Sequence, residues 1–159
     1  VYADSGWLPD AYIAGHYATI QGGTNADVVF ADAIVKSLGG FDKQLAYKAM
    51  LKNAYHQSEN PQIKGRFLAD YLRYGYVTAS SWKSASSRTL EYAYNDFCIA
   101  QVAKILNDAG QYQQLLKRSL NSFKLFYDSV GYFWAKDTLG RWMEDFSLQS
   151  KLRNAWDDP

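Results

Sequence analysis

The sequence of 159 residues has little of several features that mark common protein classes. Cys98 is its only cysteine, so no internal disulfide can form. The two histidines, His16 and His56, lie too far from Cys98 along the chain to make a short-spaced zinc motif. Proline occurs only at positions 9, 61 and 159, which leaves the long central segments without a helix breaker. These shortages argue against a disulfide scaffold and a zinc module.

Charge and hydropathy narrow the choice of partner. Lys and Arg number 17 against 16 Asp and Glu, so the formal net charge is only +1. Nucleic acids and anionic membranes attract proteins through clustered positive charge, so we expect neither as a partner. No apolar run approaches the roughly 18–20 residues that a membrane span needs.

The content of hydrophobic and aromatic residues indicates a globular protein. Hydrophobic residues make up 48% and aromatic residues 16% of the sequence, which argues against disorder and suits either a ring-rich core or rings that face a ligand. We expect residues 1–159 to form a single segment, because no composition shift marks a linker. The chain begins at Val1 without a methionine or a charged-then-apolar leader, so we expect a processed or excised piece.

Apolar periodicity and turn residues predict mainly helices. Helices are expected over 25–38, 42–57, 65–74, 88–109 and 111–129. Thr24 or Asn25, Asp42 and Ser87 are the expected N-caps. The helix over 88–109 is apolar around most of its circumference, so we expect it to be buried between neighbours. Residues 1–23 are expected to form irregular loop, and a short β-hairpin is expected near residues 132–143. The fold class is therefore all-α, built from antiparallel helical hairpins.

Few residue patterns point to a chemistry. The stretch QGGTNAD lacks the spacing and the lysine of a phosphate loop, and no G-x-S-x-G motif is present. Cys98 falls within a helical segment, where we expect a buried, inert thiol. Carboxylates among aromatic rings remain, and this is the equipment of glycosidases.

Glu91 is the strongest candidate for acid–base chemistry. It lies near the start of the mostly apolar helix, between Leu90 and Tyr92. Apolar surroundings raise the pKa of a carboxyl group and keep it protonated, as a general acid requires. A helix N-terminus and the nearby Arg88 lower that pKa instead. The pattern alone therefore leaves open whether Glu91 is an acid or a charge that complements the helix start.

Four blocks of the sequence resemble one family, in order along the chain. They are SGWLPDAYIAGHYATIQGGTNADVVFADAIVKSL, LRYGYVTAS with SSRTLEYAYNDF, KRSLNSFKLFYD, and GYFWAKDTLGRW. Together they resemble glycoside hydrolase family 92, the exo-acting α-mannosidases, and the stretch QGGTNAD-x3-ADA-x-VK is similar to the fungal-type members. The resemblance extends from about Gly6 to about Phe146.

The resemblance implies a fold and an activity. The fold is an (α/α)6 barrel, of which residues 1–159 would form part of the catalytic domain. The activity is inverting, calcium-dependent release of terminal α-linked mannose from glycans, by a secreted protein. By its place in the matching block, Glu91 is the general acid. The resemblance also makes Asn25, Asp27, Asp32 and Arg88 candidates for substrate binding, whereas it assigns no metal ligand to this segment.

The sequence also departs from the family pattern. The resemblance implies a catalytic base in a Gly-Asn-Asp-Asp-type motif and a further glutamate in a Glu-Gly-x-x-Trp-type segment, and neither motif occurs here. An N-terminal β-sandwich domain is also missing from this sequence. We therefore expect a piece of the barrel that carries the acid and lacks the base, with the calcium ligands outside it.

Two other interpretations stay open from the sequence. A truncated relative could bind a glycan or another partner without hydrolysis, using exposed rings such as Trp7, Trp82, Trp134 and Trp142. A structural helical domain without a ligand is the third.

Overall fold

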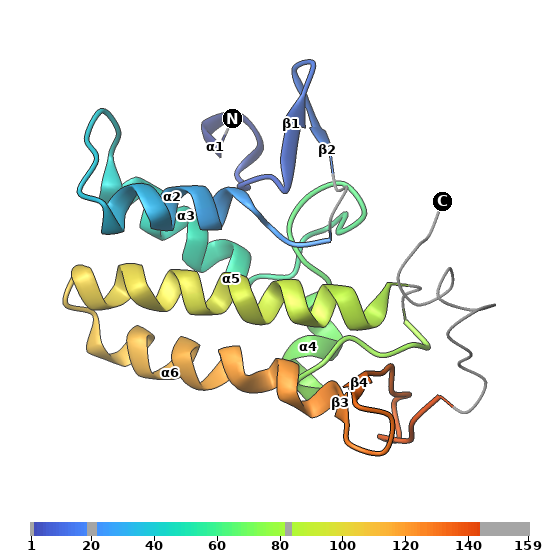
Figure 1. Ribbon diagram of the computed structural model, residues 1–159. Coiled ribbons are helices and arrows are strands. Elements are labelled where there is room, and N and C mark those ends of the chain that lie inside the picture. Colours follow the sequence, from blue (N-terminus) through green and yellow to red (C-terminus); the bar gives the residue numbers. More distant parts are fainter. Residues whose placement is uncertain (1, 19–21, 82–83, 144–159) are drawn as a thin grey trace.

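The computed structural model describes residues 2–18, 22–81 and 84–143 (Figure 1). The N-terminal part contains α1 (Tyr2–Ser5), β1 (Ala11–Ile13) and β2 (His16–Ala18). The body consists of α2 (Ala26–Val35), α3 (Lys43–Tyr55), α4 (Leu68–Tyr74), α5 (Ala85–Ile105) and α6 (Ala109–Ser119). A 3₁₀ helix, η1 (Leu120–Leu125), leads into β3 (Phe126–Tyr127) and β4 (Tyr132–Phe133).

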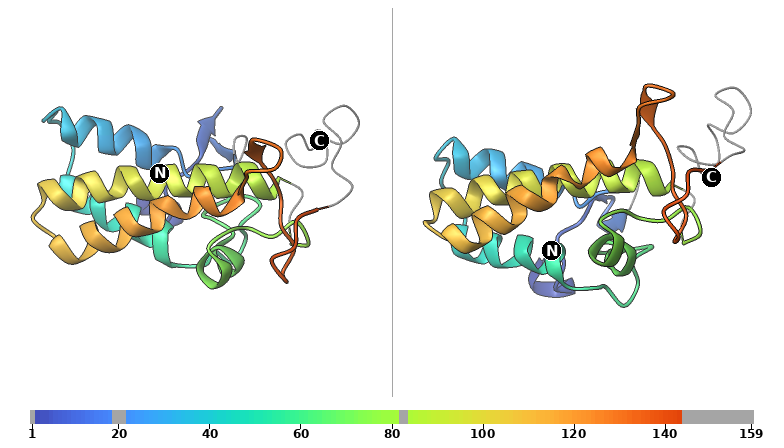
Figure 2. Two further views of the ribbon diagram at one scale, coloured as in Figure 1. Left: turned by 60° about the horizontal axis from the view of Figure 1, so that its bottom comes forward. Right: turned by 90° about the horizontal axis from the view of Figure 1, so that it is seen from below.

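The helices form two antiparallel hairpins, α2–α3 and α5–α6 (Figures 1 and 2). Helices α2 and α5 lie side by side and run in the same direction, so their N-terminal ends share one end of the molecule. The predicted all-α class is confirmed. This parallel arrangement brings the glycine-rich turn before α2 against the first half of α5.

Local capping explains where several helices begin and end. The Asp42 carboxylate accepts hydrogen bonds from the backbone N–H groups of Gln44 and Leu45, at 2.9 and 3.0 Å, as predicted for an N-cap. Gly75 ends α4 in the left-handed conformation, with φ of 81°. Asn25, by contrast, makes no side-chain cap, because its amide is used in a contact described below.

Helix α5 differs from its predicted bounds at both ends. It begins at Ala85, so the expected N-cap Ser87 lies inside the helix. It ends at Ile105 rather than near Gly110, because Asn107 has a left-handed φ of 61° and Asp108 caps α6 with a 3.1 Å bond from the Gln111 N–H. The predicted helix over 111–129 is likewise too long. Its last part continues as η1 and then as strand β3.

Two short hairpins replace predicted loop or helix. Within residues 2–18, strands β1 and β2 pair antiparallel, with Ala11 opposite Ala18, so the prediction of irregular loop was wrong there. Strands β3 and β4 pair with Phe126 opposite Phe133. The hairpin predicted near 132–143 is present as an antiparallel bridge between Lys136 and Trp142, around the turn Asp137–Gly140.

The main core lies between the two hairpins. Small residues of α5, Ala100 and Ala103, are fully buried and let the neighbouring helices approach closely. Helix α5 is not buried on all sides, however. Tyr94 and Phe97 are 53% and 43% exposed, so one face of α5 remains open in the described part of the chain. Across the described residues, no helix is long and apolar enough to cross a membrane.

Candidate active site

A turn of two glycines presses directly on α5 at the shared end of α2 and α5. A Cβ built on Gly23 would lie 3.2 Å from Glu91 Oε2 and 3.0 Å from Asn95 Oδ1. A Cβ on Gly22, whose φ is +90°, would lie 3.1 Å from Arg88 Cγ. An added side chain at either position would displace these neighbours by a few tenths of an ångström, and the left-handed φ of Gly22 favours glycine. The turn therefore forms a floor beneath the Glu91 carboxyl group.

Glu91 is half-buried at this floor. Burial raises its pKa above the ordinary value, and the negative charge of Asp10 adds to the rise. Because α5 begins at Ala85, Glu91 lies beyond the first turn, where the helix dipole has little effect. The lowering influence that its sequence position suggested is thus weak. A carboxyl group in this setting keeps its proton to higher pH than an exposed glutamate.

Asp10 was not found by sequence reasoning, and it belongs to the same cluster. Its Oδ1 accepts a 2.6 Å hydrogen bond from Asn25 Nδ2. Asn25 Oδ1 in turn accepts a 3.4 Å bond from Asn95 Nδ2. Asn95 follows Glu91 by one turn of α5 and lies on the same face. The side chains of Asp10, Asn25, Asn95 and Glu91 form what we call the polar shelf.

A buried ionic network supports the polar shelf from below. The Arg66 side chain is fully buried and donates through three nitrogens: Nη2 to Asp27 Oδ2 at 2.9 Å, Nη1 to Asp96 Oδ1 at 2.8 Å, and Nε to Thr24 Oγ1 at 2.9 Å. Thr24 links Arg66 to the polar shelf, because its backbone N–H donates to Asn95 Oδ1 at 2.9 Å. Arg66 thereby ties the glycine turn to α2 and α5.

The charges of this network balance. Burial raises the pKa of Asp27 to about 6, against the lowering effect of its hydrogen-bond donors. Although burial lowers the pKa of Arg66, the carboxylates of Asp96 and Asp27 outweigh it and raise that pKa. Arg118 completes the network with bonds of 2.6 and 2.8 Å to the two oxygens of Asp96. Two cations and two carboxylates are thus held together.

The predicted site residues do not all lie together in the structure. Glu91 and Asn25 lie in the polar shelf. Arg88 is buried beside it, where Nη1 donates to the Gly22 carbonyl at 3.3 Å and the guanidinium lies over the Phe67 ring. Asp27 is fully buried beneath the shelf, in contact with Arg66. Asp32 lies on the exposed face of α2, paired with Lys36 at 2.8 Å, so the structure does not bring it to the cluster.

The tryptophans proposed as exposed binding rings are mostly covered. Trp7 and Trp134 are buried, which contradicts that expectation. Trp142 is half-buried and stacks on Tyr127, with ring centroids 4.4 Å apart. Trp82 lies outside the described residues. Cys98 is buried as predicted, and burial raises the pKa of its thiol to about 11.

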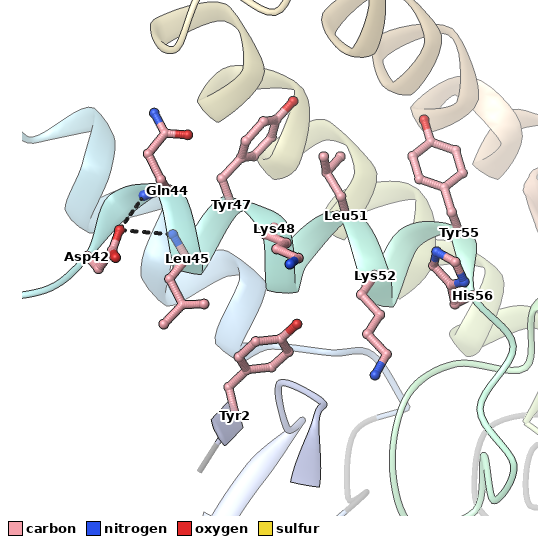
Figure 3. A pocket seen from close by; sticks show the side chains of 10 residues that line it. All are labelled: Tyr2, Asp42, Gln44, Leu45, Tyr47, Lys48, Leu51, Lys52, Tyr55 and His56. Atoms are coloured by element: carbon pink, nitrogen blue, oxygen red, sulfur yellow. Dashed lines mark hydrogen bonds between the residues drawn. The ribbon is translucent and has the colours of Figure 1, made fainter. Parts of the chain in front are cut away.

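A separate groove of about 650 Å³ runs along α3 (Figure 3). Lys48, Lys52 and Asp42 are among its lining side chains, and none of the four polar-shelf residues lines it. Tyr47 and Tyr55 point from it toward α6, where their hydroxyls donate to Asp108 and Gln111 at 3.0 and 2.7 Å. This groove is therefore separate from the polar shelf.

The described residues do not assemble a metal site. Within residues 2–18, 22–81 and 84–143, no group of three or more His, Cys, Asp or Glu side chains converges on one point. The polar shelf offers two carboxylates and two amides, which does not amount to the six to eight oxygens that calcium takes.

Comparisons with known proteins agree on one family. The model of the glycosyl hydrolase family 92 catalytic domain matches residues 1–157. An uncharacterized secreted glycosidase from Arthroderma benhamiae is 34% identical over a match that covers 89% of this chain and 21% of that protein.

Solved structures of the same family are also similar. A family GH92 α-mannosidase from Bacteroides thetaiotaomicron is 37% identical, with a TM-score of 0.72 over 79% of this chain and 16% of its own length. A family GH92 inverting mannosidase from the same organism is 29% identical, with a TM-score of 0.82 over 92% of this chain and 20% of its own. The former is also solved with mannoimidazole. The chain thus spans about a fifth of the length of these relatives.

Proposed function

The chain belongs to glycosyl hydrolase family 92, and from this premise we propose that it supplies the acid-bearing part of an α-mannosidase active site. Glu91 is the general acid, and the substrate is terminal α-linked mannose on a glycan. Solved family members that resemble the chain are mannosidases, which supports this substrate class.

The placement of Glu91 is the observation that carries the proposal. Its carboxyl group is half-buried on the glycine turn, and burial and the Asp10 charge both raise its pKa. A general acid must still hold its proton at the pH where the enzyme works. The upward shift in the pKa of Glu91, caused by burial and by the Asp10 charge, supports this role.

The residues of the polar shelf divide the work of glycoside cleavage. Glu91 donates its proton to the glycosidic oxygen as the bond to the sugar carbon breaks, so the leaving group departs as a neutral alcohol. The Asp10 carboxylate and the Asn25 amide, fixed to each other at 2.6 Å, orient sugar hydroxyls. In an inverting reaction a second carboxylate, about 6.5–9.5 Å from the acid, activates water on the opposite face of the sugar. We assign that base to a part of the protein beyond the described residues.

Calcium dependence and secretion complete the proposal for the whole protein. Calcium, when bound, polarises sugar hydroxyls, and its ligands come in part from outside the described residues. The similar Arthroderma benhamiae protein is described as secreted, which supports the same location for this one.

The test replaces Glu91 by Gln in the full-length protein. On an unactivated α-mannobiose, we expect kcat to fall by about 10²–10⁴-fold, the usual contribution of acid–base catalysis. On 2,4-dinitrophenyl α-mannoside the leaving group needs no proton, so we expect a much smaller loss. Glu59→Gln is the matched control, because Glu59 is exposed and pairs with Lys64, and it should leave both rates unchanged.

Two results would contradict the assignment. Equal losses on both substrates mean that Glu91 does not deliver the proton. Mannoside binding by the full-length protein without turnover, unaffected by Glu91→Gln, supports the alternative of a glycan-binding relative.

A further inference from the structure

A basic groove of about 490 Å³ lies between the end of α4 and the end of α6, continuing along η1. Four cationic side chains line it: Arg73, Lys117, Arg118 and Lys124. The amides of Gln114 and Asn121 line it as well. None of the described residues that line this groove is acidic.

The sequence segregates charge in the two segments that build the basic groove. No acidic residue occurs between Asp70 and Glu91, nor between Asp108 and Asp128. Folding places these two segments side by side, since α4 belongs to the first and α6 with η1 to the second. In a chain whose formal net charge is only +1, this is a strong local excess of positive charge.

Three of the four cations have no carboxylate partner in the described structure. Arg118 is neutralised by Asp96, at 2.6 Å. Lys124 Nζ instead donates to the Tyr74 carbonyl at 3.2 Å, which holds its ammonium group at the end of α4. Arg73 lies over the Tyr74 ring. Lys117 forms no ion pair with any residue that the structure describes, so its charge is available to a ligand.

A fifth cation strengthens the field, and a second groove provides a contrast. Burial and the charge of Lys124 lower the pKa of Lys136, which means that Lys136 feels the positive charge at this end of the groove. The groove along α3, with Lys48 and Lys52, also contains the Asp42 carboxylate (Figure 3). Lysines alone therefore do not make a groove suitable for an anion. The basic groove differs from the groove along α3 because no carboxylate of the described residues lines it.

We propose that the basic groove binds a phosphoryl group, carried on a sugar or free as inorganic phosphate. A dianion gains from several uncompensated cations at once, and ammonium and guanidinium groups are the usual phosphate donors. The volume is within the range of small-molecule pockets, so a hexose phosphate fits. Gln114 and Asn121 offer hydrogen bonds to its hydroxyls. The site is separate from the polar shelf, and its role is binding rather than cleavage.

Calorimetric titration of the protein with three probes tests the proposal. Mannose 6-phosphate and inorganic phosphate should bind at low ionic strength, and mannose should not bind to this groove. Added salt should weaken both, because exposed charges are screened. Binding of mannose 6-phosphate at least about tenfold tighter than of phosphate, a difference of about 1.4 kcal/mol, identifies the sugar-borne group; equal affinities identify free phosphate.

Charge removal locates the site. Lys117→Gln together with Lys124→Gln should weaken phosphate binding by at least about tenfold, because the variant removes two of the cations that attract the dianion. Both side chains are exposed, so the variant should keep the helical circular dichroism spectrum. Lys48→Gln, in the groove along α3, is the matched control and should leave the affinity unchanged.

Several outcomes overturn the proposal. The first is that neither mannose 6-phosphate nor inorganic phosphate binds. The second is that Lys48→Gln weakens phosphate binding as much as the double variant does. The third is that neither probe displaces the other from the protein. Preferential binding of an acidic peptide that phosphate does not displace assigns the groove to a protein partner instead. Choosing mannose as the carrier rests on the proposed function, but the inorganic phosphate titration does not, so failure of one leaves the other standing.

Discussion

At the scale of the residue, the environment of Glu91 decides its chemistry. The half-buried position on the glycine turn and the charge of Asp10 push the pKa of Glu91 upward, and no described cation opposes them among the main influences. The guanidinium of Arg88, which is close to Glu91 in sequence, donates to the Gly22 carbonyl and lies over the Phe67 ring. The sequence predicted that Arg88 lowers the pKa of Glu91, whereas in the structure Arg88 holds the glycine turn.

Replacing Asp10 by Asn tests this account through pH dependence. Removing the Asp10 charge lowers the pKa of Glu91, so the acid loses its proton at lower pH. In the full-length enzyme, the alkaline limb of kcat/KM, which reports an essential acid in the free enzyme, should move to lower pH. Asp128→Asn removes the same charge from an exposed turn and should leave the limb in place. A limb that does not move with Asp10→Asn rules out Asp10 as a positioning residue.

At the scale of the element, backbone conformation at helix ends matters more than helix propensity. Gly75 ends α4 with φ of 81°, and a Cβ at this position would lie 2.0 Å from Lys124 Nζ. Gly110 lies within α6, and a Cβ built on it would lie 3.8 Å from Asp108 Oδ1, an ordinary van der Waals contact. The same substitution is therefore strained at one glycine and relaxed at the other.

Gly→Ala substitutions at these two positions should have opposite effects. Gly75→Ala should lower the free energy of unfolding by about 1–2 kcal/mol, the cost of a left-handed non-glycine residue, with displacement of Lys124 added to it. Gly110→Ala should raise it by about 0.5–1 kcal/mol, because alanine restricts the unfolded chain and favours helix. Urea denaturation followed by circular dichroism measures both. Destabilisation by Gly110→Ala would contradict the helical assignment there.

At the scale of the whole molecule, the ionic network joins segments that are distant in sequence. Asp27 lies on α2, Asp96 on α5 and Arg118 on α6, and Arg66 in the loop before α4 contacts both aspartates. The network sets how the two helical hairpins meet and where the glycine turn rests. Through Thr24 the network also contacts Asn95 of the polar shelf. Through Arg118 it reaches the basic groove.

Removal of Arg66 should therefore weaken the whole fold. Arg66→Met leaves Asp27 buried without its cation, and breaking a buried pair typically costs about 3–5 kcal/mol. Arg141→Met is the matched control, because Arg141 forms an exposed pair with Asp137 and should contribute little. Unfolding in urea gives both values. Equal small losses for the two variants would show that the network does not hold the hairpins together.

An open apolar face is the other whole-molecule feature. Val29 of α2 and Tyr94 and Phe97 of α5 are 68%, 53% and 43% exposed. The chain spans about a fifth of the length of its relatives, so we propose that further parts of the domain cover this face in the whole protein. The uniform burial predicted for α5 assumed neighbours that the described residues do not supply.

Local patterns in the sequence predict the helices, the all-α class and the family. Apolar spacing, the Asp42 cap and Gly75 act within a few residues, so local rules predict their effects. Collinear blocks likewise carried the resemblance that the family match over residues 1–157 confirms. Glu91 was singled out in this way, and its role as the acid stays a prediction.

Only the tertiary structure decided which polar residues surround Glu91. Asp10 and Asn25 are separated by a hairpin, and Asn95 lies 70 positions after Asn25, yet hydrogen bonds join all three. Contacts between distant segments likewise pair Asp27, a substrate-binding candidate from the sequence, with Arg66, and bring Lys117 and Lys124 beside Arg73. Sequence patterns report the period of one helix. They do not report which face of it meets another segment, because packing of distant segments sets that.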